Sequence, residues 1–386
     1  MIGYSPGRLF GIRPNAMSAP VHPDCQHPRL PAEWEAQAAL MLTWPHASGD
    51  WGEHLAAAEA CFERLAAAAA RYQPVLIVCP DSRTSARVRN RLRSAGVSPQ
   101  RMIFTEAPSN DVWARDHGPI TVRRAGGRAQ LLDFRFNGWG ERYPADEDDR
   151  LTRRLTEEGV IGGESYRRIE WILEGGSIDS DGAGTLLTTT RCLLNPNRNT
   201  DTGREEVEAQ LRARLGIRRV LWLESGWLCG DDTDGHVDML ARFVDRRTIA
   251  HAVCEDPDDP HYAPLRALRE ELQAARTRNG DPYRLVELPL PAPIHDEDGN
   301  RLPATYANFV FVNGAVLVPV YDDPADAIAC ARLAQACPGR DIVRVPAQDL
   351  IRQGGSVHCA TMQLPAGVII DGLATGAEAT RRVHEA

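Results

Sequence analysis

Several features that would assign a chain to a class are absent from this sequence of 386 residues. No window approaches the roughly 18 consecutive apolar residues of a membrane-spanning helix, so we expect no association with a membrane. The nine cysteines are odd in number and form no Cys-x-x-Cys pair, which argues against both a disulfide framework and a zinc knuckle. Free thiols are typical of a reducing compartment, and we therefore expect a cytoplasmic protein.

An excess of positive charge is also missing. The 44 basic residues are outnumbered by 53 acidic residues, and the formal net charge is -9. Nucleic acids require a basic surface, so this balance argues against a nucleic-acid partner. An acidic field instead favours a small cationic ligand.

Apolar residues, by contrast, are abundant, and at 43% of the chain they suffice for a large core. The length exceeds that of a usual single domain, which leaves two or three domains or one large closed repeat fold. Residues 1–29 show no periodicity, and their apolar cluster, Leu9 to Ile12, is too short for a signal peptide. We expect a flexible arm over residues 1–29, with Met17 as a candidate native start, and a single catalytic domain over residues 30–386.

Helical and strand patterns recur along the rest of the chain. Strands are predicted at residues 39–45, 74–79 and 101–105, and helices at residues 53–72, 82–95, 146–159, 203–215, 262–276 and 323–336. Hairpins are predicted over residues 120–134, 177–190, 237–252, 309–320 and 357–370, and Asn313-Gly314 is the strongest turn signal among them. Five similar units of roughly 45 to 75 residues predict an α/β fold, namely a five-bladed pseudo-symmetric propeller.

The loop that enters each hairpin carries residues capable of chemistry. These loops span residues 110–118, 173–176, 230–238, 306–308 and 354–359. If five units surround one axis, the loops lie together at one end of it, and we expect their carboxylates, histidine and cysteine to converge. In the last loop Gly354 and Gly355 allow a tight turn. Cys359 is therefore predicted to face a site, although most buried thiols are inert.

Five motifs follow one another between Leu30 and about Gly372. They are Trp113-Ala114-Arg115-Asp116, Leu173-Glu174-Gly175-Gly176-Ser177, Leu194-Asn195-Pro196-Asn197-Arg198-Asn199, Gly235-His236-Val237-Asp238 and Gly354-Gly355-Ser356-Val357-His358-Cys359. Together they resemble the motifs of the agmatine deiminases, which belong to the guanidine-modifying or pentein superfamily with the arginine and peptidylarginine deiminases. The resemblance implies the five-bladed α/β propeller of that superfamily, in agreement with the repeat count.

The resemblance also implies an activity. The enzyme would be a hydrolase that converts agmatine and water to N-carbamoylputrescine and ammonia, in the polyamine biosynthesis that leads to putrescine, and it would be a homodimer. Cys359 would be the nucleophile that forms a thiouronium intermediate, and His236 the general acid and base. Asp116 and Asp238 would bind the guanidinium, and Glu174 would either orient His236 or contact the substrate.

Elementary chemistry supports these residue types independently. A guanidinium is cationic at neutral pH and presents a planar fork of N–H donors, which two carboxylates can hold. Positive charge from the substrate and from a protonated His236 would favour the thiolate that attacks the central carbon. Because His236 and Asp238 are two residues apart, an extended strand would turn both to one face. A ring of acids would oppose the oxyanion of a cysteine protease.

Three more residues are predicted to contact the substrate. Trp113 could pack on its methylene chain, although simple burial explains this tryptophan equally well. The terminal amine of agmatine requires an acceptor such as Asp232 or Asp234, whereas free arginine would require a basic group. The acidic loop therefore favours agmatine.

The spacing of the same loop argues against a metal. A calcium loop needs acids at its first, third and fifth positions and glutamate at its twelfth, but Gly230 and Ala241 occupy the first and the twelfth. Zinc would need a third ligand beside His236 and Asp238, and none follows at helical spacing. We predict no metal and no cofactor.

Four positions depart from the usual agmatine deiminase pattern. Many members carry asparagine at the positions of Asp234, Met239 and Ser356, and glutamine near Met362. These positions belong to the expected substrate shell, so a deiminase of peptidyl-arginine or of another substituted guanidine is the alternative. A catalytically silent propeller that binds cations is a third hypothesis, against which the intact cysteine, histidine and two aspartates argue.

Overall fold

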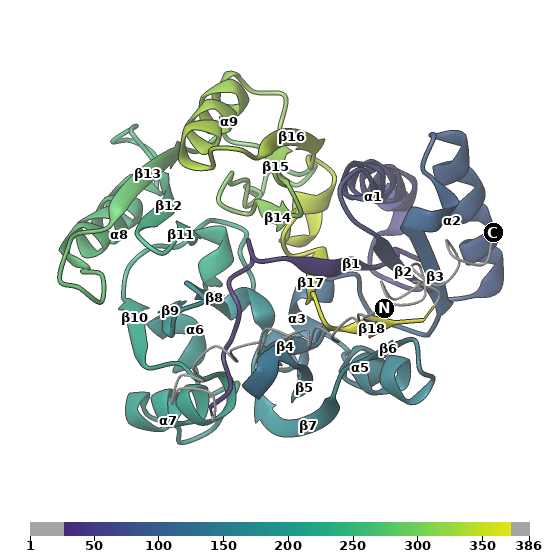
Figure 1. Ribbon diagram of the computed structural model, residues 1–386. Helices are drawn as coiled ribbons and strands as arrows, with labels where there is room; N and C mark the ends of the chain where they lie inside the picture. The colour runs from purple at the N-terminus through teal and green to yellow at the C-terminus, as the bar shows by residue number, and fades with distance from the viewer. Residues whose placement is uncertain (1–26, 372–386) are drawn as a thin grey trace, which may run out of the picture.

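The computed structural model describes residues 27–371 as a mixed α/β molecule whose small sheets follow one another around the centre of the view in Figure 1. The predictions of a flexible arm and of a start at Met17 concern residues that lie outside this range, apart from residues 27–29. Within it, Arg29 already pairs with Arg123 through both backbone hydrogen bonds. The division into an arm and one catalytic domain stays a prediction.

Five of the sheets share one plan, in which an antiparallel pair of strands is extended by parallel strands. They are β4-β5-β7, β8-β9-β10, β11-β12-β13, β14-β15-β16 and β17-β1-β2-β3, and β6 and β18 form a separate pair. The strands are β1 Gln37–Thr43, β2 Val75–Cys79, β3 Met102–Glu106, β4 Ile120–Arg123, β5 Ala129–Arg135, β6 Ile161–Gly162, β7 Ser165–Ile172, β8 Ile178–Ser180, β9 Thr185–Thr189, β10 Arg219–Leu223, β11 Ala241–Asp245, β12 Thr248–Val253, β13 Arg284–Pro289, β14 Val310–Val312, β15 Ala315–Val320, β16 Asp341–Pro346, β17 Thr361–Pro365 and β18 Ile369–Ile370.

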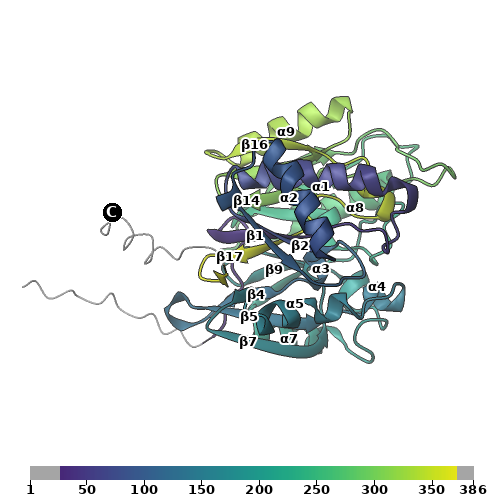
Figure 2. The ribbon, with the colours of Figure 1, turned by 90° about the vertical axis from the view of Figure 1, so that its right-hand side faces the viewer.

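The predicted helices are confirmed, with ends that shift by a few residues. They are α1 Leu55–Ala70, α2 Ser82–Ser94, α5 Asp148–Glu157, α7 Arg204–Leu215, α8 Tyr262–Ala274 and α9 Pro324–Ala336, and three short turns are α3 Ala114–His117, α4 Gly138–Glu141 and α6 Thr190–Leu193. Local chemistry explains the ends, because Asp323 forms a capping box with Asp326 ahead of Pro324. The longer helices lie outside the strands (Figures 1 and 2), and α1 and α9 each contact two neighbouring sheets.

Central strands of the sheets are apolar throughout because they are covered on both faces. Every residue of β2, β12 and β15 is buried, which is why these segments read as continuous hydrophobic runs. The loops at their ends are therefore attached to a rigid core.

Four of the five predicted hairpins are confirmed, and the fifth is wrong. The pairs β4-β5, β8-β9, β11-β12 and β14-β15 are antiparallel neighbours. Residues 357–370 do not fold back on themselves, since β17 pairs with β1 and β18 pairs with β6. The apolar strand β1 offers β17 an antiparallel edge inside the core, and a local turn does not.

The sheets are not joined to one another by strand pairing within the described residues. Among residues 27–371 no sheet closes on itself, so the structure establishes a mixed α/β fold but not the closed propeller that the repeat predicts. No helix in this range combines the length and the apolar character needed to cross a bilayer.

One repeated feature places the functional residues. The last parallel strand of each sheet, namely β3, β7, β10, β13 or β16, leads into a loop that enters the next antiparallel pair. These are the five loops in which the sequence carries its candidate residues. Each sheet thus contributes one loop to the site.

Candidate active site

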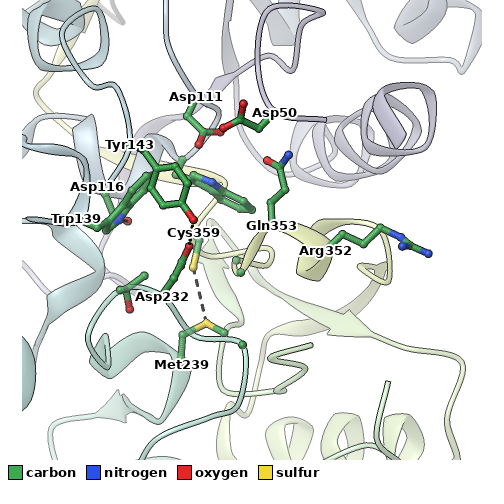
Figure 3. Close-up of a pocket in the computed structure, with 15 residues that line it drawn as sticks. Asp50, Asp111, Asp116, Trp139, Tyr143, Asp232, Met239, Arg352, Gln353 and Cys359 are labelled. Carbon is green, nitrogen blue, oxygen red and sulfur yellow. Dashed lines mark hydrogen bonds between the residues drawn. The ribbon is translucent and has the colours of Figure 1, made fainter. Parts of the chain in front are cut away.

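A cavity of about 290 Å³ lies where these loops meet, with Cys359 in its wall (Figure 3). Segments far apart in the sequence line it together: Asp50, Asp111, Trp113, Asp116, Trp139, Tyr143, Gly230, Asp232, Thr233, Met239, Arg352, Gln353, Gly354, Gly355 and Cys359. The list contains four of the eight predicted site residues: Trp113, Asp116, Asp232 and Cys359. Glu174, His236 and Asp238 are fully buried behind this wall, so the predicted convergence of the loops is confirmed.

Cys359 is held by contacts from three loops. Its Sγ accepts a hydrogen bond from Asn308 Nδ2 at 3.1 Å and lies 3.6 Å from Asp238 Oδ2. Its backbone carbonyl accepts from the Arg115 N–H at 3.1 Å. A Cβ at Gly355 would lie 2.5 Å from the Trp113 ring. The glycine is therefore required for the close approach of backbone to indole, and Trp113 packs under the loop of residues 354–359 as well as lining the cavity.

The thiol of Cys359 is protonated in the unliganded protein. Burial raises its pKa well above the ordinary value, and the negative charges of Asp238 and Asp116 raise it further. A cationic ligand between these groups would reverse the electrostatic part of this effect.

Asp116 lies in α3 with both carboxylate oxygens bonded. Oδ1 accepts from the Gly176 N–H at 2.9 Å, and Oδ2 accepts from Trp139 Nε1 at 3.0 Å. Burial raises the pKa of Asp116 and the nearby His236 opposes this rise. A Cβ at Gly176 would lie 2.6 Å from His236 Nδ1, which explains the glycine of the second motif.

His236 is fully buried, and its Nδ1 lies 3.7 Å from Asp116 Oδ1. Burial lowers its pKa, but Asp116, Cys192 and Glu174 outweigh burial and leave the pKa well above the ordinary value. These neighbours therefore favour the protonated form of the ring. Both ring nitrogens are buried without a hydrogen-bond partner among the described residues, and a ring nitrogen lies within 4.8 Å of the Cys192 sulfur.

Glu174 stabilises this imidazolium through its negative charge. Its Oε1 accepts from Arg198 Nε at 2.6 Å, while its Oε2 has no partner within residues 27–371. Glu174, Cys192 and His236 also bring ligand atoms within 4.8 Å of one another, the geometry of a possible metal site. The Arg198 ion pair and the imidazolium both compete with a cation there, and the absence of a metal stays a prediction.

Asp238 lies in a 3-10 turn, Val237–Met239, and not on an extended strand. The expectation that His236 and Asp238 share one strand face is therefore wrong. The two side chains still approach one region: His236 Nδ1 and Asp238 Oδ2 would lie 2.6 and 3.1 Å from a Cβ at Gly176. His236 Nδ1 lies 3.7 Å from Asp116 Oδ1, and Asp238 Oδ2 lies 2.7 Å from His358 Nδ1. Burial raises the pKa of Asp238, but His358 outweighs burial, and the net pKa is lowered. Its Oδ1 has no partner among the described residues.

The two acids predicted to bind the amine are placed differently. Asp232 lines the cavity and accepts from the Tyr143 hydroxyl at 2.7 Å (Figure 3). Asp234 does not line it, because its oxygens accept from Arg142 at 2.5 Å and from Arg198 at 2.5 Å. The structure thus places Asp234 in an ion-pair cluster and Asp232 in the wall of the cavity.

Several residues of the site were given no role from the sequence. Asn308 contacts the thiol from the fourth loop, and its position in that loop was the available signal. Trp139 reaches Asp116 from α4, whose left-handed Trp139 and Gly140 (φ 55 and 87) carry no motif. Glu33 contacts His358 from a segment that no pattern connects to the site.

The departures from the agmatine deiminase pattern mostly lie outside the cavity lining. Ser356 Oγ lies at hydrogen-bond distance, 3.3 Å, from the Tyr321 hydroxyl, and the Met362 sulfur lies 3.8 Å from Arg115 Nη1. Met239 alone of the four lines the cavity, 3.9 Å from Cys359 Sγ.

Comparison with known proteins gives consistent matches. The model of the Porphyromonas-type peptidyl-arginine deiminase family matches residues 29–365. An agmatine deiminase of Stutzerimonas stutzeri is 36% identical over 359 residues, which cover 87% of this chain and 95% of the relative. A substrate-bound variant of the agmatine deiminase of C. jejuni superposes with a TM-score of 0.81 at 37% identity and covers 88% and 97% of the two chains. A putative arginine deiminase of Porphyromonas gingivalis superposes with a TM-score of 0.81 at 45% identity and covers 89% and 99%.

Proposed function

The chain belongs to the Porphyromonas-type peptidyl-arginine deiminase family, and we propose that it is a hydrolase that deiminates agmatine to N-carbamoylputrescine and ammonia. The bond broken is a C–N bond other than a peptide bond. Relatives that carry the name agmatine deiminase match nearly the whole chain at about 36% identity.

One observation carries the proposal. The thiol of Cys359 lies 3.6 Å from an oxygen of the buried Asp238, and the charge of the buried Asp116, which lies 3.7 Å from His236 Nδ1, also raises the pKa of this thiol. The carboxylates would hold a planar cation by paired hydrogen bonds, and the sulfur would face its carbon. No neutral acyl substrate needs this arrangement of anions.

Binding is proposed to generate the nucleophile. The guanidinium would neutralise the carboxylates that raise the pKa of Cys359, so that the thiol loses its proton as the substrate binds. The thiolate then forms a C–S bond with the guanidinium carbon. The lost proton is taken up again when the product leaves.

His236 would serve both halves of the reaction. In the first half it donates its proton to the departing nitrogen, the C–N bond breaks, and ammonia leaves a thiouronium on Cys359. In the second half the neutral imidazole removes a proton from water, whose oxygen attacks the same carbon. This proton restores the imidazolium. Cleavage of the C–S bond then releases N-carbamoylputrescine, and the proton of the added hydroxyl returns to the departing sulfur. Glu174 would hold the charge and orientation of the ring.

The far end of the cavity suits an ammonium better than a carboxylate. Asp50, Asp111 and Asp232 line the cavity, and Asp232 would accept the terminal amine of agmatine. Arg352 also lines the cavity, but both of its contacts at 2.8 Å go to the carboxylate oxygens of Glu297. Free arginine would bring a carboxylate toward these three acids, which disfavours it.

We further propose that the five three- and four-stranded sheets are the blades of a five-bladed propeller. Their common strand plan and the one loop that each contributes support this. By resemblance to the agmatine deiminases, we infer one catalytic domain over residues 30–386 and a homodimer active in polyamine biosynthesis. The eight described cysteines are all free thiols, which supports the cytoplasm as its location.

The test is an assay of ammonia and ureido product with agmatine, free arginine and a blocked arginine peptide. Agmatine should be turned over fastest, and Cys359→Ser should keep less than about 1% of activity because a covalent nucleophile is lost. Cys330→Ser in α9 is the matched control and should remain active. Preference for the arginine peptide would establish the alternative substrate class, and no product from any of the three would refute the enzyme.

A further inference from the structure

We propose that His358 is a positioning residue: it clamps one oxygen of Asp238 and leaves the other oxygen free for the guanidinium. The proposal rests on the proposed deiminase function and adds a residue that the mechanism above does not use. His358 precedes the nucleophile in the chain, and it is not among the residues that line the cavity.

The two ring nitrogens of His358 lie between two carboxylates. Nδ1 is 2.7 Å from Asp238 Oδ2, and Nε2 is 2.6 Å from Glu33 Oε2. An ionised carboxylate can only accept hydrogen bonds, so both nitrogens must donate. Only the imidazolium has two N–H groups, and His358 is therefore a fixed cation beneath the site.

Glu33 anchors this cation from the other side. Its Oε1 accepts from the Phe311 N–H at 2.7 Å, and its Oε2 accepts from Arg242 Nη2 at 2.9 Å. Burial raises the pKa of Glu33, but Arg242, His358 and Arg115 outweigh burial, and the pKa is lowered far below the ordinary value. Glu33 therefore stays ionised and holds the His358 ring in place through the contact to Nε2.

The consequence appears at Asp238. Its Oδ2 is occupied by His358, whereas its buried Oδ1 has no partner among the described residues. A buried acceptor without a partner is unfavourable, and a guanidinium N–H would supply the missing hydrogen bond. His358 thus leaves one oxygen of the carboxylate to the substrate and holds the other, which lies 3.6 Å from Cys359 Sγ.

A merely structural role for His358 makes a different prediction from a positioning role. A structural residue changes the amount and stability of folded enzyme. A positioning residue changes the ionisation of Asp238 and the binding of a cation. The charged and titratable groups that face the Asp238–His358 pair from all packed elements are Glu33, Arg115, Asp116, Asp179, His236, Arg242 and Cys359.

The variant His358→Gln tests this difference, because glutamine has one donor group and no positive charge. We expect kcat/KM for agmatine to fall by about 10- to 100-fold, the range found for residues that orient a ligand-binding group. We also expect the acid limb of its pH profile to move to higher pH, because Asp238 loses the cation that keeps it ionised. In a Cys359→Ser background, calorimetry should show weaker agmatine binding when His358→Gln is added.

His251→Gln is the matched control, since His251 is an equally buried histidine whose Nδ1 contacts only the Ala252 carbonyl in the described structure. Its pH profile should be that of the wild type. Glu33→Gln removes the anchor of His358 without changing Asp238 and should also move the acid limb of the pH profile to higher pH. This variant replaces His358→Gln in the test if His358→Gln does not fold. An unchanged profile and unchanged binding in the folded variants would overturn the proposal. A wild type inactive on agmatine would instead refute agmatine as the substrate, and inactivity on all three guanidines would refute the deiminase function.

Discussion

Removal of the negative charge of Asp238 should make the thiol of Cys359, the proposed nucleophile, more reactive while it abolishes turnover. In the free enzyme Asp238 Oδ2 lies 3.6 Å from Cys359 Sγ, and its charge is one cause of the raised thiol pKa. Asp238→Asn keeps the shape of the side chain and removes the charge. The same change deletes a proposed guanidinium ligand, so agmatine hydrolysis should be lost.

The size of the effect follows from the distance. Two unit charges 3.6 Å apart interact by about 1 kcal/mol in bulk water and by about 5 kcal/mol at an effective dielectric constant of about 20. This range corresponds to a thiol pKa lowered by roughly 1 to 3 units. A thiolate of lower pKa is also a weaker nucleophile, with a Brønsted coefficient of about 0.4–0.5, so alkylation should become about 3-fold to 50-fold faster.

The assay measures iodoacetamide modification of the unliganded protein near neutral pH, with intact mass and peptide mapping at Cys359. Cys359→Ser reports labelling of the other cysteines. Asp133→Asn is the matched control, because Asp133 is a buried aspartate of β5 that pairs with Tyr166 and Arg168 and has no contact with Cys359 in the described structure. A thiol in Asp238→Asn that reacts no faster than in the wild type would refute the electrostatic account of Cys359.

Two further outcomes are expected. Burial and the neighbouring carboxylates raise the pKa of Asp111 to about 7. As pH rises through this value Asp111 gains its negative charge, so the KM for agmatine should fall several-fold. Asp111→Asn should abolish this pH dependence of KM. A wild-type KM that does not change across neutral pH would contradict this role of the Asp111 charge. Arg198→Met should lower the free energy of unfolding by about 3–5 kcal/mol, because it leaves Glu174 and Asp234 buried without their cation. Urea denaturation measures this loss, and a change below about 1 kcal/mol would show that the ion pairs contribute little.

Local patterns were sufficient for most of the fold. The helices and the first four hairpins follow from apolar periodicity and from turns such as Asn313-Gly314, where Gly314 has a φ of 81. The fifth hairpin failed because β17 takes its partner from the opposite end of the chain. Pairing over such a separation leaves no mark on the short stretch that was used to predict the turn.

In the site, too, local motifs could be read from the sequence and contacts across the core could not. Cys359, His236, Asp116 and Asp238 could be identified because motifs carry them, and the structure brings them together. The Glu33–His358–Asp238 chain could not be predicted, because Glu33 lies in a segment without a motif and acts through contacts across the core. The backbone at Asp238 was mispredicted, since a 3-10 turn replaces the assumed strand. Backbone geometry of a single turn decided which group each side chain meets.

The pairing of β1 with β17 has a consequence for biosynthesis. A ribosome that has made β1 must make nearly the whole chain before the antiparallel partner of that strand exists, since β17 begins at Thr361. Until then the apolar edge of β1 is open, which is the kind of edge that recruits other chains. Cys359 lies two residues before β17, so the step that seals the sheet also positions the nucleophile. The pairing that places Cys359 at the proposed site is therefore among the last contacts that synthesis of residues 27–371 makes possible.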